Sequence, residues 1–283
     1  MSIAILNLSG QHNCCIGFLI HIFNEYNIDI FTAHDNDKHC EYYKSLYPQS
    51  NIHLKGTNLF QIQNYNLSVN INSHDRLYRY PGMLSIAHVI EHTDIFNKFI
   101  SLTPWVEGDN IKYIFPLYRG IKVKNYKNKI ILFGSFGPDC VDEDLRNFIN
   151  NLKDYEFWFI GGEKYIEEFD SYLNVKQLHK KIDMIELVNH IKESKFILTK
   201  KIPYQLTDRY SGALGHSMSH CKPMIIQTYI STTYDLPGIT FETNYSETIN
   251  TIKNMSDEGY VHLLNLIDEK NKEITNKNRE LLN

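Results

Sequence analysis

A polar loop that leads into a helix of small residues is the part of this chain best suited to bind an anion. The stretch covers residues 208–226 and reads DRYSGALGHSMSHCKPMII. Ser211 and Gly212 open the predicted helix, so unpaired backbone N–H groups and the positive end of the helix dipole face outward. Such a helix start can hold a diphosphate. Ser211 can equally be an N-cap and Gly212 a close-packing residue, and both interpretations stay open.

A second cluster has the spacing of a metal site. Residues 88–92 read HVIEH, which resembles the H-x-x-E-H pattern of the inverzincin metallopeptidases, where a helix presents two histidines and a catalytic glutamate to zinc. His88 and His92 share a face only at helical spacing. The residues MLSIAHV favour a strand here, and no third ligand follows in a matching context. A zinc metallopeptidase is therefore an alternative, while the main interpretation involves no metal.

The remaining sequence excludes several classes of protein. It has no G-x-x-x-x-G-K-[ST] loop and no G-x-S-x-G elbow, and the segment SGQHN after the first strand lacks the G-x-G-x-x-G of dinucleotide enzymes. The chain carries 29 basic and 33 acidic residues, a formal charge of -4, without a dominant basic face. Because proteins that grip nucleic acid normally show a clustered positive field, nucleic acid is excluded as the main ligand.

Cysteine usage and hydrophobicity predict a cytoplasmic protein without a membrane span. The five cysteines are odd in number and form no C-x-x-C pair, which indicates reduced thiols. The opening IAILNL is too short for a signal peptide, and no apolar run approaches the roughly 18 residues of a membrane-spanning helix. Heavy use of Asn, Ile, Lys and Tyr indicates an AT-rich genome, viral or from a low-GC microbe, and a viral protein would act in the host cytoplasm.

The first half of the chain is predicted to alternate strands with helices and to form a parallel sheet. Its predicted helices are Cys15–Tyr26 and Lys38–Leu46. Polar residues end or follow most of its strands, as expected of strands that feed a binding cleft. The predicted strands are Ile3–Leu8, Ile28–Ala33, Ile52–Leu54, Leu67–Asn72, Met83–Val89, Phe99–Leu102 and Tyr113–Phe115.

A second unit of the same kind is predicted after the basic segment Arg119–Lys129. Its predicted strands are Ile130–Phe133, Glu156–Ile160, Phe196–Thr199 and Met224–Gln227. Its predicted helices are Val141–Leu152, Met184–Ile191, Ala213–Cys221 and a polar helix from Ser256 toward Leu282. The expected fold is therefore α/β, with two Rossmann-like domains, residues 1–125 and 126–283, facing across a cleft.

Short motifs stand at defined places in the second half. GSFG follows its first strand, FIGG ends its second, IDMIELVNHIKESKFILT covers a helix, a turn and a strand, and HCKPMII closes the anion-binding stretch. Over residues 129–255 these motifs resemble the GT-B glycosyltransferases, in which a similar loop and helix ending in g-K-P-v-i hold a nucleotide sugar. The first half matches that family only in its order of elements.

The resemblance implies a donor site for a UDP- or GDP-sugar in the second half, with no cofactor required. His216 stands where retaining members carry a glutamate on the ribose hydroxyls, so an inverting enzyme is expected. A metal-independent enzyme is expected because a helix start and cationic side chains can stabilise the leaving diphosphate. Arg209, with Lys200 or Lys201, would supply charge to the diphosphate. The residues expected to contact the donor are Gly134, Ser135, Phe136, Gly161, Gly162, Arg209, Ser211, Gly212, Ala213 and His216.

The resemblance also implies that the first half binds the acceptor, a glycan or small molecule with a free hydroxyl. An inverting transferase needs one general base near that hydroxyl. The candidates are His12, Asp75, His88 and His92, of which His88 follows a predicted strand and has Glu91 nearby. Because His216 replaces the glutamate and no cationic pair is evident, a non-catalytic binding protein with the same fold is a second hypothesis.

Overall fold

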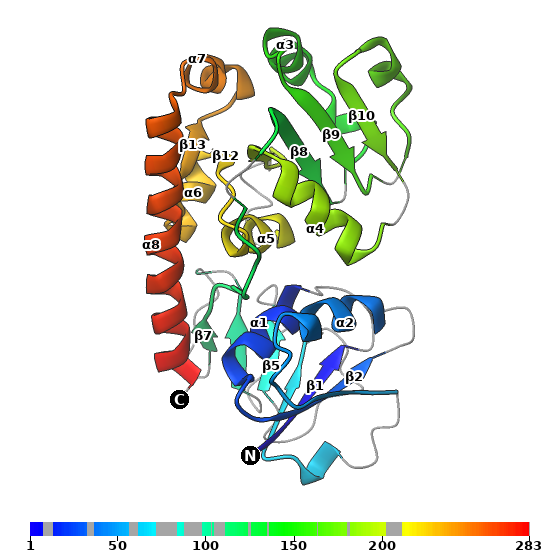
Figure 1. Ribbon diagram of the computed structural model, residues 1–283, viewed down its shortest axis with the longest axis vertical. Helices are drawn as coiled ribbons and strands as arrows, with labels where there is room; N and C mark the ends of the chain where they lie inside the picture. The colour runs from blue at the N-terminus through cyan, green and yellow to red at the C-terminus, as the bar shows by residue number, and fades with distance from the viewer. Residues whose placement is uncertain are drawn as a thin grey trace. The chain divides into compact units, whose positions relative to one another are not determined.

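The computed structural model describes residues 1–7, 14–32, 37–56, 62–71, 84–87, 98–102, 104, 111–123, 126–134, 136–162, 164–179, 182–201 and 211–282. Contacts between residues divide the chain into two units (Figure 1). The first unit comprises Met1–Arg119, Gln205–Gly215 and Ile274–Asn283, and the second comprises Gly120–Tyr204 and His216–Glu273. The division after Asn125 that the sequence suggests stays a prediction.

The first unit is built on a seven-stranded sheet in the order β3-β2-β1-β4-β5-β6-β7, in which all neighbouring strands are parallel. The chain first adds strands on one side of β1 and then continues on the other side. The strands are β1 (Ser2–Asn7), β2 (Asn27–Thr32), β3 (Ile52–Lys55), β4 (Leu67–Asn70), β5 (Leu84–Ala87), β6 (Lys98–Ser101) and β7 (Ile111–Tyr113). Its helices include α1 (Cys14–Phe23) and α2 (Asp37–Ser45), and η2 (Ile62–Asn64) is a 3-10 turn.

The sequence of β1 explains its central position in this sheet. Ile3 and Leu6, and the two residues between them, are all 0% exposed. A strand covered on both faces must be apolar at every position, whereas a half-exposed strand alternates. The continuous run IAIL therefore favours the middle of a parallel sheet.

The second unit repeats this plan with a six-stranded parallel sheet in the order β10-β9-β8-β11-β12-β13. The strands are β8 (Lys129–Phe133), β9 (Glu156–Ile160), β10 (Val175–Leu178), β11 (Phe196–Leu198), β12 (Met224–Gln227) and β13 (Gly238–Phe241). Its helices include α3 (Glu143–Asn151), α4 (Met184–Glu193), α6 (Thr228–Tyr234) and α7 (Ile249–Lys253), with 3-10 turns η5 (Pro138–Cys140), η6 (Glu167–Ser171) and η8 (Tyr245–Thr248). Two further helices, α5 (Gly212–Ser219) and α8 (Asp257–Leu282), are divided between the units, after Gly215 and after Glu273.

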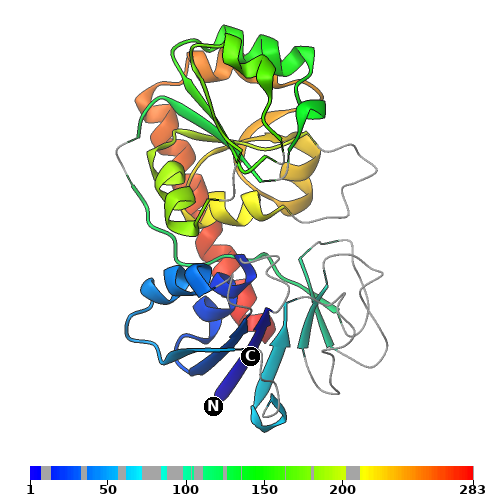
Figure 2. The same cartoon turned by 90° about the vertical axis from the view of Figure 1, so that its right-hand side faces the viewer.

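Helices flank the strands of this second sheet (Figure 2), with α4 against β8 and α6 against β12 and β13. Aromatic residues fill the core between them. Phe148 of α3 is fully buried, and its ring lies 5.7 Å from the ring of Phe157 in β9 and 5.7 Å from that of Tyr245. Such edge-to-face and tilted pairs add to the free energy gained by burying apolar area.

Most elements that the sequence predicts are confirmed within a few residues, and some are missed. The missed elements are β10, α6, β13 and α7. β10 is a sheet edge in which only Val175 is fully buried, so its sequence lacks the apolar run of a central strand. α3 begins two residues later than predicted because the side chain of Asp142 accepts a hydrogen bond from the Leu145 N–H and caps the helix.

Two further expectations can be compared with the described residues. Cys15, Cys40, Cys140 and Cys221 are free thiols. Within the part of the chain that the structure describes, no helix has both the length and the apolar character needed to cross a membrane.

The carboxylate of Asp144 ties α3 to two other parts of the second unit. It accepts hydrogen bonds from the backbone N–H groups of Tyr245 (2.6 Å) and Ser246 (3.1 Å), and it lies 2.7 Å from the Lys201 ammonium. Burial opposes ionisation of Asp144, but the hydrogen bonds from Lys201, Ser246 and Tyr245 outweigh burial and hold its pKa below the ordinary value. The ionised form is therefore the one that the fold stabilises.

We predict that Asp144→Asn lowers the free energy of unfolding by about 2 kcal/mol at neutral pH, because charge-assisted hydrogen bonds are lost. With a depressed folded-state pKa, the stabilisation is present above the unfolded-state pKa of about 4 and is lost as the pH falls through the lower folded-state value. The difference between wild type and variant should therefore shrink below about pH 4, as measured by denaturant unfolding across that range.

Glu143→Gln is the matched control, since Glu143 is an exposed carboxylate in the same first turn of α3. Its effect should stay within about 0.5 kcal/mol. A difference between Asp144→Asn and wild type that is independent of pH would contradict the role assigned to the Asp144 charge.

Candidate functional site

The second sheet has a topological switch point at β8. The chain runs from β8 outward to β9 and β10 and then returns to β11 on the other side of β8. In open parallel sheets, ligands bind outside the carboxyl ends of the strands at such a point, where loops leave in opposite directions. A ligand site is therefore expected at the segments that follow β8, β9 and β11.

Two glycines with left-handed backbone follow β8 and β9. Gly134 has φ +113° and Gly161 has φ +87°, conformations that side chains disfavour. A Cβ atom on Gly161 would lie 3.5 Å from the Gly134 carbonyl oxygen, so the two loops pass close to each other. Gly134 donates its N–H to the Ile160 carbonyl at 3.0 Å, which fixes the spacing. That Gly134 and Gly161 contact the donor stays a prediction.

Phe136 is turned inward from the same loop. It is 5% exposed, its ring lies 5.9 Å from that of Phe159, and a Cβ on Gly162 would come within 2.6 Å of it. Gly162 is therefore the residue that leaves room for this ring. The Phe136 side chain therefore belongs to the core. Ser135, also expected at the donor, lies outside the described residues.

Helix α5 carries the other predicted donor residues. Ser211 precedes the helix, Gly212 and Ala213 begin it, and contacts group these residues with the first unit, while His216 groups with the second. His216 is 8% exposed, and its ring lies 5.9 Å from that of Phe133, the last residue of β8. His216 is thus placed beside the carboxyl end of the central strand.

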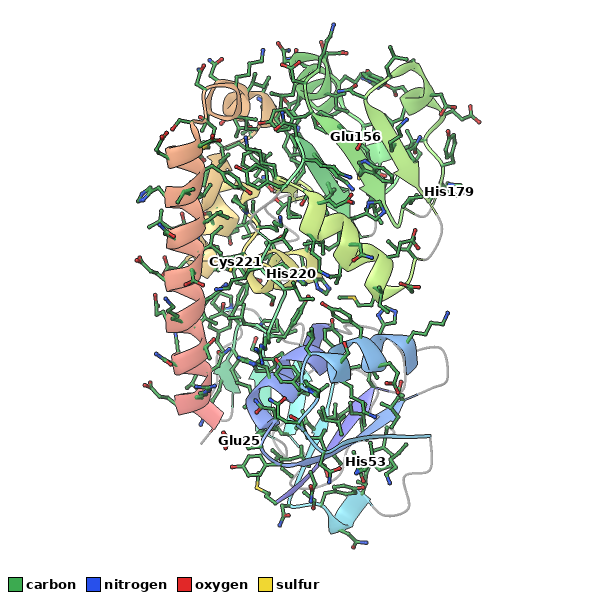
Figure 3. The ribbon with its side chains drawn as sticks, in the orientation of Figure 1. Glu25, His53, Glu156, His179, His220 and Cys221 are labelled. Carbon is green, nitrogen blue, oxygen red and sulfur yellow. The ribbon has the colours of Figure 1, made fainter. Side chains whose placement is uncertain are left out.

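The lysine of the K-P step has a structural role that the sequence did not reveal. Lys222 is 1% exposed and donates hydrogen bonds to the carbonyl oxygens of Lys192 (2.7 Å) and Ser194 (2.8 Å) at the end of α4. A cation at the carboxyl end of a helix satisfies otherwise unpaired carbonyl groups. Burial lowers the pKa of Lys222 to about 8. It follows His220 and Cys221, which Figure 3 labels at the end of α5.

Lys201 is also engaged within the second unit. Its ammonium lies 2.6 Å from Asp142 and 2.7 Å from Asp144, and it stands 4.7 Å from the ring centre of Tyr245. Two carboxylates thus neutralise the Lys201 charge, which the sequence suggests as a partner of the diphosphate. Lys200 is exposed and forms no ion pair with any residue in the described ranges. Arg209 lies outside those ranges.

All four base candidates, His12, Asp75, His88 and His92, lie outside the described residues, as does Glu91. The strands that precede them along the chain are β1, β4 and β5, which are neighbours in the first sheet. Among the residues that are described, no group of three or more His, Cys, Asp or Glu side chains could hold a metal ion. Because the H-x-x-E-H segment is not among them, the zinc alternative stays a prediction.

Buried polar residues at strand ends in the first sheet were not singled out from the sequence. Each is the last residue of its strand and at most 3% exposed. The available signal was an apolar run closed by one Asn, Ser or Thr, which is the pattern of a parallel strand whose end meets a polar site. These residues are Asn7, Thr32, Asn70 and Ser101.

Solved structures of several proteins share the fold of this chain. No protein-family model and no curated protein matches the sequence. AviGT4, a glycosyltransferase involved in avilamycin A biosynthesis, superimposes with a TM-score of 0.60 at 12% identity, covering 100% of this chain and 98% of that one. The glycotransferase of kitacinnamycin gives 0.54 at 10% identity, with 98% and 95% covered. The UDP-GlcNAc 2-epimerase of Neisseria meningitidis, bound to UDP-GlcNAc, gives 0.53 at 12%, with 100% of both chains covered. The chain has a GT-B-like fold.

The GT-B-like fold confirms the predicted α/β class with two Rossmann-like domains. The identities are low, so the likeness concerns the fold and leaves the chemistry to be argued from residues. Within the second domain, Gly134, Gly161, Gly162 and His216 gather at the carboxyl edge of the sheet. Lys201 is paired with a carboxylate, and Lys222 donates hydrogen bonds to backbone carbonyl groups, so both cations have internal partners.

We predict that Lys222→Met lowers the free energy of unfolding by about 1–3 kcal/mol, because two buried carbonyl groups lose their donor. Affinity for UDP or GDP should stay within about twofold of wild type when both proteins are folded. Thermal unfolding and calorimetric titration measure the two quantities. Lys200→Met, at an exposed lysine, is the control and should change stability by less than about 0.5 kcal/mol. Unchanged stability with lost nucleotide binding would instead assign Lys222 to the ligand.

Proposed function

We propose that this chain is a glycosyltransferase that moves a sugar from a UDP- or GDP-sugar to a hydroxyl of a glycan or small molecule. The observation that carries the proposal is the switch point of the second domain, where two left-handed glycines and His216 meet beside β8 in a GT-B-like fold. Two structures of similar fold are described as glycosyltransferases, and a third was determined with UDP-GlcNAc bound.

The donor diphosphate is proposed to bind backbone N–H groups at the start of α5, from Ser211 to Ala213, together with the glycine loops and Arg209. Backbone donors suit this task because glycine lets a phosphate approach closely and a helix start adds positive potential. The His216 ring is proposed to hydrogen-bond a ribose hydroxyl through one of its nitrogens. These donors would stabilise the departing diphosphate without a metal ion.

Transfer is proposed to be a single displacement with inversion. The acceptor oxygen attacks the anomeric carbon while the bond from that carbon to the diphosphate oxygen breaks, and the nucleoside diphosphate leaves with the electron pair. A general base takes the hydroxyl proton. His88 is the first candidate because it follows β5 and has Glu91 close in sequence to orient its ring, and His12, Asp75 and His92 are the others.

A non-catalytic binding protein of the same fold is the second candidate. The observation that favours it is that two lysines have internal partners. Lys201 pairs with Asp142 and Asp144, and Lys222 donates to carbonyl groups at the end of α4. A protein of this kind would bind a nucleotide sugar without releasing UDP or GDP.

The proposed transferase predicts that His88→Ala lowers turnover by about 10²–10⁴-fold, the usual effect of losing a general base, while nucleotide affinity is nearly unchanged. Release of UDP or GDP is followed with a panel of hydroxyl acceptors, and the product is identified by its mass. His53→Ala is the control, since His53 is an exposed histidine of β3 in the same unit (Figure 3).

Three outcomes separate the alternatives. Full activity in a stably folded His88→Ala protein would move the proposed base to Asp75 or His12. Joint loss of thermal stability and activity would make His88 a structural residue. Nucleotide binding by the wild type without any release of UDP or GDP would support the binding protein over the transferase.

A further inference from the structure

A buried lysine in the second unit has its charge surrounded by aromatic rings. The Lys195 ammonium stands between 5.4 and 5.9 Å from the ring centres of Tyr260, Tyr126, Phe196 and Tyr155. Cations at such distances are attracted by the electron-rich faces of the rings. The residue as a whole is 9% exposed.

The backbone of Lys195 is fully paired, which fixes the origin of the side chain. Its N–H donates to the Lys129 carbonyl at 2.8 Å, and its carbonyl accepts from the Tyr260 hydroxyl at 2.9 Å. The ammonium is different, because no residue in the described part of the chain forms an ion pair or hydrogen bond with it. Burial lowers the pKa of Lys195, and Asp257 acts in the opposite direction without reaching ion-pair distance.

Lys195 and one of these rings, Tyr155, line a small polar pocket of about 230 Å³. Leu152 and Ile252 form buried apolar parts of the lining, while Lys253 is exposed and adds a second positive charge. Asp154 also lines the pocket and is its one acidic residue. The full lining is Asn128, Asn151, Leu152, Asp154, Tyr155, Lys195, Ile252, Lys253 and Met255.

The pocket belongs to the amino edge of the second sheet. Asn128 precedes β8, Tyr155 precedes β9 and Lys195 precedes β11, so all three enter the sheet from this edge. Glu156 is the first residue of β9 and His179 directly follows β10, so these two residues, labelled in Figure 3, mark the amino and carboxyl ends of their strands. Because every strand of the sheet is parallel, the pocket lies opposite the proposed donor site.

We propose that this pocket is a second ligand site, which binds a small oxyanion such as phosphate or a short carboxylate on Lys195. The physical reason is that the Lys195 ammonium has no hydrogen-bond acceptor among the described residues, and an oxyanion supplies both acceptors and the opposite charge. Cation–π contacts hold the side chain in place but use none of its three N–H donors. Lys253 adds attraction from the rim, and Asp154 limits the affinity by repulsion.

The test follows the thermal unfolding midpoint of the full chain against phosphate, acetate and chloride at constant ionic strength. A ligand that binds only the folded state raises the midpoint in a saturable way. We expect a saturable rise with phosphate or acetate and none with chloride, and the comparison of phosphate with acetate identifies the preferred oxyanion. Lys195→Met should need an oxyanion concentration at least about tenfold higher for the same rise in the midpoint. Lys176→Met, at an exposed lysine of β10, should respond as wild type does.

If Lys195→Met does not fold, variants of Asp154 and Lys253, which also line the pocket, provide the same test. Asp154→Asn should bind the oxyanion more tightly and Lys253→Gln less tightly, in opposite directions from wild type. UDP should still stabilise Lys195→Met, because the donor site is separate. An oxyanion response that is absent, or equal in wild type, Lys195→Met, Asp154→Asn and Lys253→Gln, would overturn the proposal.

Discussion

Parallel pairing of the strands is the constraint on which the site depends. In a parallel sheet all carboxyl ends lie along one edge, so the loops that follow the strands gather there whatever their sequence. In the second unit the return of the chain from β10 to β11 places loops on both sides of β8. The glycines after β8 and β9 then let two backbone segments pass close together, with the His216 ring beside the end of β8.

Several side chains that could bind a ligand instead have partners inside the second unit. Lys222 closes the carboxyl end of α4, Lys201 joins Asp142 and Asp144, and Phe136 fills the space above Gly162. Each of these contacts gives its side chain a structural role in the second unit. The proposed binding of the diphosphate therefore relies on few groups, backbone N–H groups at the start of α5 and Arg209, because Lys201 and Lys222 have internal partners.

The sequence predicted the alternation of strands and helices because apolar runs and amphipathic stripes report burial directly. Ile3–Leu6 and Met224–Ile226 are clear examples, since their members are nearly all fully buried. β10 could not be predicted because an edge strand such as VKQL buries few side chains. The role of Lys222 could not be predicted because its partners are carbonyl groups about 30 residues away in the sequence. Hydrogen bonds between segments distant in sequence leave no periodic signal. The candidate bases stay predictions, since His12, Asp75, His88 and His92 lie outside the described residues.

The most direct test of the donor site is a calorimetric titration of the intact chain with UDP- and GDP-sugars, made on wild type and on Gly212→Val. The branched side chain of valine would block the close approach of a diphosphate to the start of α5. We expect one of the donors to bind wild type at a single saturable site, and at least about tenfold more weakly to Gly212→Val with the fold intact. Gly56→Val, where an added Cβ meets nothing within 4 Å, serves as control and should bind like wild type. Equal affinity in Gly212→Val and wild type, or no binding of either class of donor, would contradict the account.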